Sequence, residues 1–422
     1  MGGWGRRSAS AIILAEVVMA VEYGKTAPVL PDMMKDLGFG MGFGGLLMLG
    51  FGAASLVLAL PSAALASHVG HRRLVLGSLC IAIAGNVLGI VAFGCADAVA
   101  RMLLCASRVA EGVGYCVVTV CGPAVISAWF PPRRRGIRMG AWGASVALGM
   151  LVATSAAPVL ADLWGWRSLW ALSLFGAVLA LVAAALLLRM PAKSKRPERA
   201  APSMRRIAEG ATPCALLIAC MYCALNFGFD TFNDFSITYL IERLSLSTDR
   251  ASIVFALGCV TMMLGSLLGG VGIARASRRE RLLCLTMAMA LVCFFLQFRL
   301  EGDFAAQAAY QGLAALVYGS LPAMLCFLAP ESARDPRGSD VSVGIMVFGQ
   351  NVGTLVGPFA CGLIIDHGGW VACSNAVFSV FLVGMAASIA FSVLWRHGVS
   401  RRRDAGISLE GPVCSEDGGR SV

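Results

Sequence analysis

Seven ionisable side chains lie within long apolar runs of the sequence. They are Glu16, Glu22, Lys25, Arg108, Glu111, Asp230 and Asp234. A charged side chain at the centre of a bilayer costs roughly 2.5 kcal/mol or more even on lenient insertion scales, so such residues mark functional or ion-paired positions. Their types allow two chemistries. The carboxylates can take up and release protons, and the two bases can bind an anion or keep a neighbouring carboxylate ionised.

The spacing of these residues determines which of them can meet. At 100° per residue, Glu22 and Lys25 lie about 60° apart on a helix, whereas Glu16 points about 180° away from Lys25. Glu22 and Arg108 lie roughly 13 Å and 10 Å from the outer ends of their segments, so they can meet near the middle of the bilayer. We therefore predict that Glu22 carries protons and that Arg108 is its countercharge. The alternative is a static ion pair that locks the two helices together.

A second acidic face lies in the later part of the chain. Asn226, Asp230 and Asp234 follow i, i+4, i+8 spacing and line one face of a helix. We predict that Asp230, together with Asp234, takes part in proton coupling. Glu111 is expected to serve packing or hydrogen bonding, and Glu16 to act as a gate residue or to reach toward the membrane surface. Because the two bases also permit a bound anion, the sign of the substrate's charge stays open.

The composition sets the class of protein. The chain is 58% hydrophobic and 14% charged, against about 25% charged residues in an average soluble protein, which indicates an integral membrane protein. The 15 cysteines lie mostly singly in apolar runs, where they behave as small hydrophobic side chains. The CMYC sequence at Cys220 and Cys223 is interpreted as packing. No metal site or cofactor is predicted.

Twelve apolar segments of about 18 to 29 residues can each cross a bilayer as a helix. They span residues 11–31, 44–66, 74–95, 101–126, 139–161, 168–189, 213–241, 252–274, 282–299, 305–329, 341–365 and 371–395. The sequence therefore predicts an all-α membrane protein with twelve transmembrane helices. The first segment contains acidic residues and lacks a small-residue cleavage pattern, so it is not interpreted as a signal peptide.

The distribution of Lys and Arg predicts the orientation in the membrane. Of the 34 basic residues, 26 lie in alternate connecting loops and the two tails, and only six lie in the other loops. Because cytoplasmic loops carry the excess of Lys and Arg, both termini are predicted to be cytoplasmic, in an inner membrane. The same spread of charge along the chain excludes a nucleic-acid-binding module.

The chain divides into two similar halves. Residues 190–212 are rich in Pro, Lys and Arg and predict a cytoplasmic linker. It separates a six-helix bundle at 1–189 from a second at 213–396, and 397–422 form a polar tail that we expect to be disordered. The halves match each other at a shift of about 207 residues, which predicts an internal duplication of the kind common in secondary transporters.

Several motifs resemble a known family. RVAEGVG at 108–114 is similar to the Arg-x-x-x-Gly-x-Gly signature in the fourth helix of the major facilitator superfamily, and WGWR, ending at Arg167, is typical after its fifth helix. GMLVATSAAPVLA at 149–161 is similar to a degraded Gly-Pro motif associated with exporters. The run from Pro123 through WFPPRRRGIRMGAWG weakly resembles the cyanate-permease-like branch. The resemblance covers essentially the whole chain.

The resemblance implies two pseudo-symmetric bundles that work by alternating access, with helices 1, 4, 7 and 10 lining a central cavity. Three of these four helices hold all seven charges, and the tenth supplies Gln311 and Tyr318. These two residues therefore join Asn226 and the charged residues as candidates for substrate binding or proton coupling.

The loop after the second helix, ASHVGHRRL, occupies the place of a conserved gating signature of that family. It has Ser67 where the family has an acid, which puts the usual cytoplasmic gate contact in doubt. We expect this loop and its counterpart in the second half to gate the cytoplasmic face. The candidates are Gly70, Arg72, Arg73, Arg275 and Arg279.

Together these features predict a secondary active transporter that moves a small organic solute, coupled to protons, and functions as a monomer in the bilayer. Two narrower interpretations stay open: a proton/drug efflux antiporter for cationic or neutral compounds, and an uptake carrier for a small anion. A polytopic membrane enzyme or a sensor is the rival class. The sequence contains no metal-binding His/Glu motif, no GxxxxGK[ST] nucleotide loop and no added soluble domain.

Overall fold

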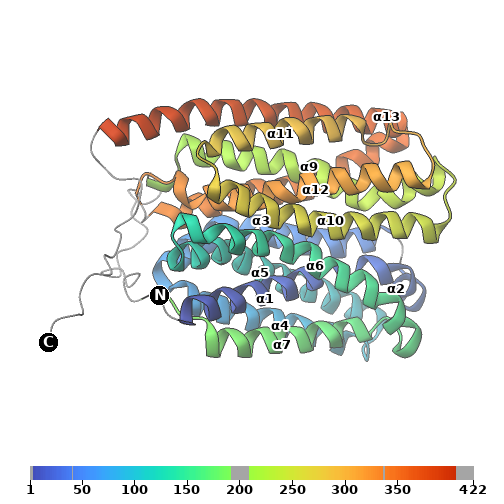
Figure 1. The fold of residues 1–422 in the computed structure, drawn as a ribbon. Helices are drawn as coiled ribbons and strands as arrows, with labels where there is room; N and C mark the ends of the chain where they lie inside the picture. Colours follow the sequence, from blue (N-terminus) through green and yellow to red (C-terminus); the bar gives the residue numbers. More distant parts are fainter. Residues whose placement is uncertain (1–2, 40, 192–208, 336–337, 405–422) are drawn as a thin grey trace.

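The computed structural model describes residues 3–39, 41–191, 209–335 and 338–404, and almost all of them are helical. Figure 1 shows long helices that run side by side through the molecule. The helices are α1 (Gly3–Gly24), α2 (Leu30–Leu37), α3 (Met41–Val69), α4 (His71–Ala92), α5 (Asp97–Trp129), α6 (Pro132–Trp164), α7 (Ser168–Leu187), α9 (Pro213–Glu242), α10 (Thr248–Arg275), α11 (Arg279–Leu296), α12 (Phe304–Leu328) and α13 (Ser339–Asp404), with short 3-10 turns η1 (Ala27–Val29) and η3 (Pro330–Ser332).

The last element, α13, consists of two helices joined at Gly369. This glycine has φ 75° and ψ −178°, a conformation that interrupts the helix and that glycine adopts without steric cost. Two separate apolar spans, Ser339–Ile365 and His367–Arg396, lie along α13. With these counted separately and the short α2 set aside, the described residues form the twelve long helices that the sequence predicted.

The first helix is offset from its predicted position. The sequence predicted residues 11–31, but α1 spans Gly3–Gly24. Pro28 and Pro31 follow it, and because proline lacks a backbone N–H and disfavours a helical residue before it, the helix cannot run straight through both. The chain forms η1 and α2 instead. Lys25 therefore lies just beyond the end of α1 and not inside a helix.

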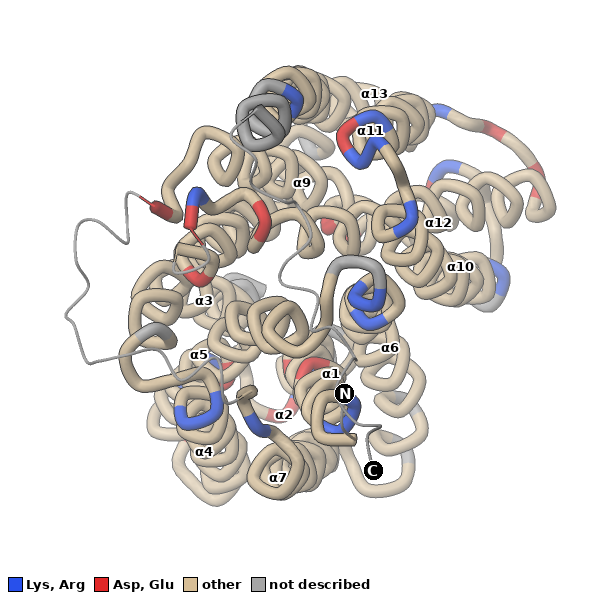
Figure 2. Tube along the Cα trace, turned by 60° about the vertical axis from the view of Figure 1, so that its left-hand side comes forward, with Lys and Arg blue, Asp and Glu red and all other residues tan. Residues whose placement is uncertain are grey.

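The helices form two bundles that lie against each other, as Figures 1 and 2 show. The first contains α1 to α7 and the second α9 to α13. Within the bundles α4 packs against α5 and α9 against α13, and between them α6 packs against α10 and α3 against α13. Most of the predicted linker and tail lies outside the described residues, although α13 continues to Asp404.

Glycine permits the closest approaches between helices. A Cβ atom on Gly265 of α10 would lie 2.0 Å from the carbonyl oxygen of Leu316 in α12. A Cβ atom on Gly353 of α13 would lie 2.2 Å from the carbonyl oxygen of Cys223 in α9. These helix pairs therefore pack backbone to backbone, in the way that small residues allow in membrane proteins.

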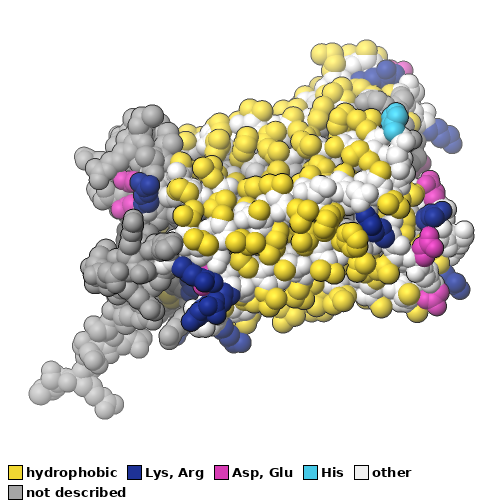
Figure 3. Space-filling model, turned by 90° about the horizontal axis from the view of Figure 1, so that it is seen from above, with side chains coloured by type: hydrophobic (Ala, Val, Ile, Leu, Met, Phe, Trp, Pro, Cys, Tyr) yellow, Lys and Arg dark blue, Asp and Glu magenta, His cyan; other side chains and the backbone are white. Residues whose placement is uncertain are grey.

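The surface of the molecule is that of an integral membrane protein. Figure 3 shows hydrophobic side chains covering its side, with charged groups gathered toward the two ends. Phe175 and Phe359 are 70% and 71% exposed; such a continuous apolar surface suits lipid and not water. Within the described part of the chain, ten helices are long and apolar enough to cross a membrane by length and composition. Charged residues interrupt the apolar run of α1, and α11 begins with three charged residues, Arg279, Glu280 and Arg281, before its apolar run.

Candidate functional site

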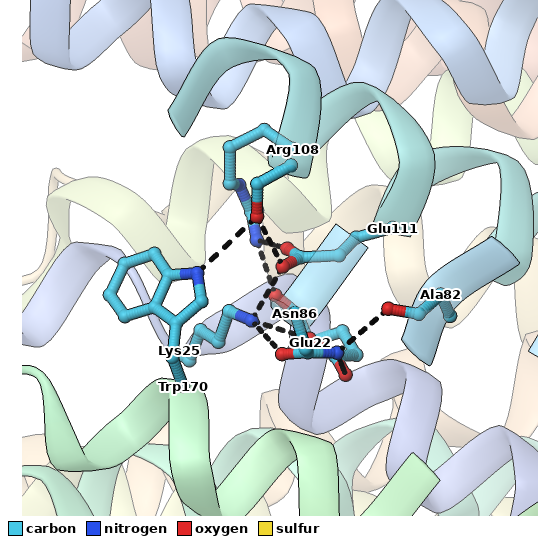
Figure 4. Close-up of polar contacts among 8 residues, drawn as sticks. Glu22, Lys25, Ala82, Asn86, Arg108, Glu111 and Trp170 are labelled. Carbon is cyan, nitrogen blue, oxygen red and sulfur yellow. Dashed lines mark hydrogen bonds and ion pairs between the residues drawn. The ribbon is translucent and has the colours of Figure 1, made fainter. Parts of the chain in front are cut away.

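A cluster of charged and polar side chains is sealed inside the first bundle at the end of α1 (Figure 4). Nζ of Lys25 donates to Oε2 of Glu22 at 2.6 Å and to Oε1 of Glu111 at 2.7 Å. It also donates to Oδ1 of Asn86 at 2.8 Å, and the Asn86 amide donates to Oε1 of Glu22 at 2.6 Å. All four side chains are 0% exposed. Lys25 therefore ties the end of α1 to α4 and α5.

Arg108 completes this buried cluster from α5. Its Nη1 donates to Oε2 of Glu111 at 2.5 Å and to the backbone carbonyl oxygen of Glu22 at 2.8 Å. Glu22 lies in the last turn of α1, where carbonyl groups lack partners within the helix. The guanidinium also lies over the ring of Phe51, 4.6 Å from its centroid. Arg108 thus supplies a hydrogen-bond donor both to a backbone carbonyl group at the buried end of α1 and to the carboxylate of Glu111.

The structure gives Glu22 a different countercharge from the predicted one. Its carboxylate pairs with Lys25, while Arg108 pairs with Glu111. The depth estimate behind the prediction assumed a longer first helix, and the true end of α1 brings Lys25 to the place expected for Arg108. Two acids and two bases cancel in charge, and Glu111 also accepts a hydrogen bond from Oγ of Ser107 at 2.9 Å. The cluster is thus electrically neutral, and among its described polar atoms the buried Nε of Arg108 is left without a hydrogen-bond partner.

A separate cavity lies between the two bundles; it holds about 880 Å³ of empty space when the part that is open to solvent is included. Its wall comes from α1, α3, α5 and α6 of the first bundle and from α9, α10, α12 and α13 of the second. The helices predicted to line a cavity, the first, fourth, seventh and tenth, are α1, α5, α9 and α12, and all four contribute.

Two carboxylates line this central cavity, one from each bundle. Glu16 of α1 is 1% exposed, and both its oxygens share the hydroxyl of Thr119, at 3.2 and 3.3 Å. Asp230 of α9 is 6% exposed, and its Oδ2 has no hydrogen-bond partner among the described residues. None of the described residues that line the cavity is Lys, Arg or His. A buried carboxylate is costly unless a cation or proton accompanies it, so this cavity favours both.

Aromatic rings form much of the remaining wall. They are Tyr23, Phe51, Tyr115 and Trp142 from the first bundle and Tyr222, Phe229 and Tyr318 from the second. In the first bundle, the rings of Tyr23, Phe51 and Tyr115 lie together with centroids 5.4 to 6.0 Å apart. Rings of this kind provide apolar contact area, and their faces attract cations.

Three of the predicted second-half candidates line the central cavity. Asp230 is described above. Nδ2 of Asn226 donates to Oγ1 of Thr354 at 2.9 Å, which joins α9 to α13 beside the carboxylate. Tyr318 is buried, and its ring stacks on Phe294 with centroids 4.3 Å apart. The structure therefore brings these three residues together on one side of the cavity.

The other candidates lie elsewhere. Asp234 is exposed and is not among the residues lining the cavity, although the helical spacing placed it on the same face as Asp230. Gln311 is buried beside a smaller separate pocket, where it accepts a hydrogen bond from Oγ of Ser236 at 3.0 Å. The four charged residues of the buried cluster also lie outside the cavity wall.

Two residues of the cavity and the buried cluster were not predicted from the sequence, although the sequence held a signal for each. Glu16 was assigned to a gate or to the membrane surface, yet it lines the cavity. Its position about 180° from Lys25 was the signal, because one face of α1 packs into the buried cluster and the opposite face is left for the cavity. Asn86 is an amide in an apolar run and was overlooked because only charges were counted.

Ion pairs join the two bundles at one end of the molecule, where α4, α6, α11 and α13 begin; we call this the basal end. Glu331 of η3 pairs with Arg135 of α6 and, at 2.8 Å, with Nη1 of Arg279 of α11. Nε2 of His71 lies 3.1 Å from Oδ1 of Asp340 at the start of α13. Arg279, a predicted gating residue, pairs with Glu331 within the second bundle, and it is Arg135 that joins Glu331 to the first bundle. Glu331 was not predicted.

The remaining gating candidates lie near the same end. Gly70 has φ 88° and makes the turn between α3 and α4, a conformation that favours glycine. Nη2 of Arg72 donates to the carbonyl oxygen of Ala185 at 2.7 Å, within the first bundle. Arg73 and Arg275 are exposed.

The chain is similar to transporters of known families over part of its length. It is 32% identical to the multidrug resistance protein Stp of Mycobacterium tuberculosis over 148 residues, which are 34% of this chain and 26% of that protein. It is 27% identical to the Probable actinorhodin transporter of Streptomyces coelicolor over 212 residues, which are 49% of this chain and 36% of that protein. The match thus spans about a quarter to a third of the length of these curated relatives.

Solved structures share the fold along nearly the whole chain. The human organic anion transporter TETRAN superposes with a TM-score of 0.73 at 15% identity, covering 92% of this chain and 100% of that one. The proton:xylose symporter XylE superposes with a TM-score of 0.74 at 12% identity, covering 93% and 95%. The prediction of two six-helix bundles is thereby confirmed. The family model described as Major Facilitator Superfamily matches residues 12–333, more than half of the sequence, and the chain therefore belongs to that superfamily.

Proposed function

We propose that this secondary transporter exports an organic solute in exchange for protons. The observation that carries the proposal is the pair of buried carboxylates, Glu16 and Asp230, on a cavity shared by the two bundles. The described wall supplies no basic side chain to neutralise them. Each carboxylate is therefore most stable when it holds a proton or when a bound solute compensates its charge.

Alternating access then couples the two events. Glu16 belongs to the first bundle and Asp230 to the second, so a rocking motion of the bundles changes the surroundings of both groups at once. In the conformation open to the outside, the carboxylates take protons. In the conformation open to the inside, a solute replaces these protons, and the return motion carries the solute outward. Proton entry down its gradient thus drives solute exit.

The direction and orientation are part of the proposal. The excess of Lys and Arg in the loops at the basal end supports a cytoplasmic location for that end and for both termini. The ion pairs of Glu331 would then keep the cytoplasmic side closed in this conformation. The names of the curated relatives, a multidrug resistance protein and a probable actinorhodin transporter, support export. Lys25 and Arg108 form ion pairs within the buried cluster and do not reach the central cavity. This arrangement disfavours a carrier for small anions, because neither base is placed to bind one.

We also propose that the buried cluster is a scaffold and not the proton carrier. Its charges cancel, it has no opening to the central cavity wall, and it joins the end of α1 to α4 and α5. Glu22 was predicted from the sequence to carry protons, but it already accepts hydrogen bonds at both carboxylate oxygens. A proton on either oxygen of Glu22 would displace the donor that this oxygen already accepts, whereas a proton on Oδ2 of Asp230 would displace none.

The test is proton flux in proteoliposomes loaded with a pH-sensitive dye. Three aromatic probes of different charge are added in turn: the cation ethidium, neutral chloramphenicol and the anion naphthalenesulfonate. At least one probe should move protons across the membrane of wild-type proteoliposomes. Asp230→Asn should lose this flux at least about tenfold, while the exposed Asp97→Asn at the first turn of α5 should keep it. Probe movement in the wild type without proton flux would contradict the proposal.

A further inference from the structure

We infer that the transported solute is an organic cation with an aromatic body, held between Glu16 and Asp230. This inference rests on the proposed function and names the substrate class of the same cavity. The first reason is charge. The two carboxylates approach the cavity from opposite bundles, and the described wall holds no Lys, Arg or His. An anion would meet two acids and no base, whereas a cation supplies the compensation that the buried carboxylates lack.

The nearest base does not change this balance. Arg108 lies behind Phe51, whose ring is part of the cavity wall. Its charge is paired with Glu111 at 2.5 Å, so its field is largely cancelled before it reaches the cavity. Lys25 is likewise paired with two carboxylates. The carboxylates of the cavity wall are therefore Glu16 and Asp230, and Asp234, one turn from Asp230 on α9, adds to the same negative sign.

Unsatisfied polar atoms indicate where the solute binds. Oδ2 of Asp230 is a buried acceptor without a partner among the described residues, and Nδ2 of Asn351 is a buried donor without one. Both residues line the cavity and are more than nine-tenths buried. Buried polar groups normally have partners, so these two atoms are suited to a ligand. A cationic donor fits the first, and a hydrogen-bond acceptor on the solute fits the second.

The aromatic wall selects the body of the solute. Tyr23, Phe51 and Tyr115 form one group of rings, and Tyr222 and Tyr318 face the cavity from the second bundle. Such rings bury apolar surface and hold a positive charge over their faces. A small hydrophilic cation would leave these rings without contacts, so a bulky aromatic or otherwise apolar cation fits the cavity better.

The experiment compares three compounds of similar shape and different charge on purified wild-type protein. Equilibrium dialysis measures binding of tetraphenylphosphonium, neutral triphenylphosphine oxide and the anion tetraphenylborate. We expect the cation to bind at least about tenfold more tightly than the neutral compound, a difference of about 1.4 kcal/mol, and the anion to bind most weakly. Equal binding of the cation and the neutral compound, or tighter binding of the anion, would overturn the inference.

Variants locate the binding site. Glu16→Gln and Asp230→Asn should each raise the Kd for tetraphenylphosphonium about tenfold and leave binding of the neutral compound unchanged. Glu242→Gln, at the exposed end of α9, and Asp97→Asn are the matched controls and should change neither. If a variant does not fold, the wild-type comparison of the three compounds still decides the charge preference. Unchanged cation binding in both folded variants would refute the site.

This binding experiment uses no membrane gradient, so its failure is distinct from that of the proposed function. Preference for the cation without proton flux in proteoliposomes would support the substrate class and refute proton coupling. Proton flux driven by the neutral or anionic probe, with no preference for the cation, would support coupled transport and refute the substrate class.

Discussion

Replacing Lys25 with methionine tests the scaffold role of the buried cluster most sharply. The ammonium group contacts both Glu22 and Glu111, and all three side chains are 0% exposed. Methionine has similar length and no charge, so it leaves two buried carboxylates with one base, Arg108. Removing one partner of a buried ion pair costs about 3 to 5 kcal/mol, because the remaining charge stays in a medium of low polarity. The folded state should lose stability by this amount.

The loss can be measured as a thermal shift in detergent. With an unfolding entropy of roughly 2.1 cal/mol/K per residue, a loss of about 3 to 5 kcal/mol lowers Tm by about 3 to 6 °C for a chain of this length. Lys35→Met in α2 is the matched control, because Lys35 is exposed and the change in side chain is the same. Its Tm should stay within about 1 °C of the wild type, since surface substitutions rarely change stability by more than about 0.5 kcal/mol.

A second substitution separates a scaffold from a proton carrier. Lys25→Met alone leaves one negative charge without a base, and adding Glu22→Gln removes that charge. The double variant should therefore recover part of the lost stability and should keep proton-coupled transport. The reasoning would be refuted if Lys25→Met had a normal Tm but no proton flux. It would also be refuted if Glu22→Gln alone abolished proton flux in protein of normal stability.

Three further predictions follow from single sites. Asp234→Asn should retain proton flux within about twofold of the wild type, because Asp234 lies outside the cavity wall. A loss of flux as large as that of Asp230→Asn would show that Asp234 does take part in proton coupling. Gly265→Ala should lower stability by about 1 to 3 kcal/mol, since its Cβ would lie 2.0 Å from a backbone oxygen, whereas Gly258→Ala on the same helix, with its nearest atom at 3.8 Å, should be tolerated in a thermal-shift assay. Glu331→Gln should increase thiol-reagent labelling of a cysteine placed at the basal end between the bundles, and unchanged labelling would argue against a closing role for its ion pairs.

Much of the fold follows from the sequence because membrane helices are specified locally. A helix needs enough apolar length to cross the bilayer, and eleven of the predicted segments correspond closely to helices of the described structure. The first segment was displaced because hydrophobicity alone ignored Pro28 and Pro31, whose backbone constraints end α1 at Gly24. The break at Gly369 lay between two predicted segments, as a short turn should.

The candidate site was harder to predict, because it depends on which helix faces meet. Six of the seven charges singled out in the sequence are buried, but Glu22 was paired with Arg108, since depth along a helix does not determine which neighbour lies alongside. Helical spacing grouped Asp234 with Asp230, and only the packing of α9 separates an exposed group from one in the cavity wall. Glu16 was undervalued because its partner Thr119 comes from α5, more than one hundred residues away.

The most direct test of proton exchange is proton release on solute binding. Purified protein in weakly buffered detergent solution receives tetraphenylphosphonium, and a pH-sensitive dye reports protons set free. Protons should be released as the cation saturates the wild type, because it replaces them on Glu16 and Asp230, and release should fall in Glu16→Gln and Asp230→Asn but not in Asp97→Asn. Saturable binding of the cation without any release of protons would contradict the account.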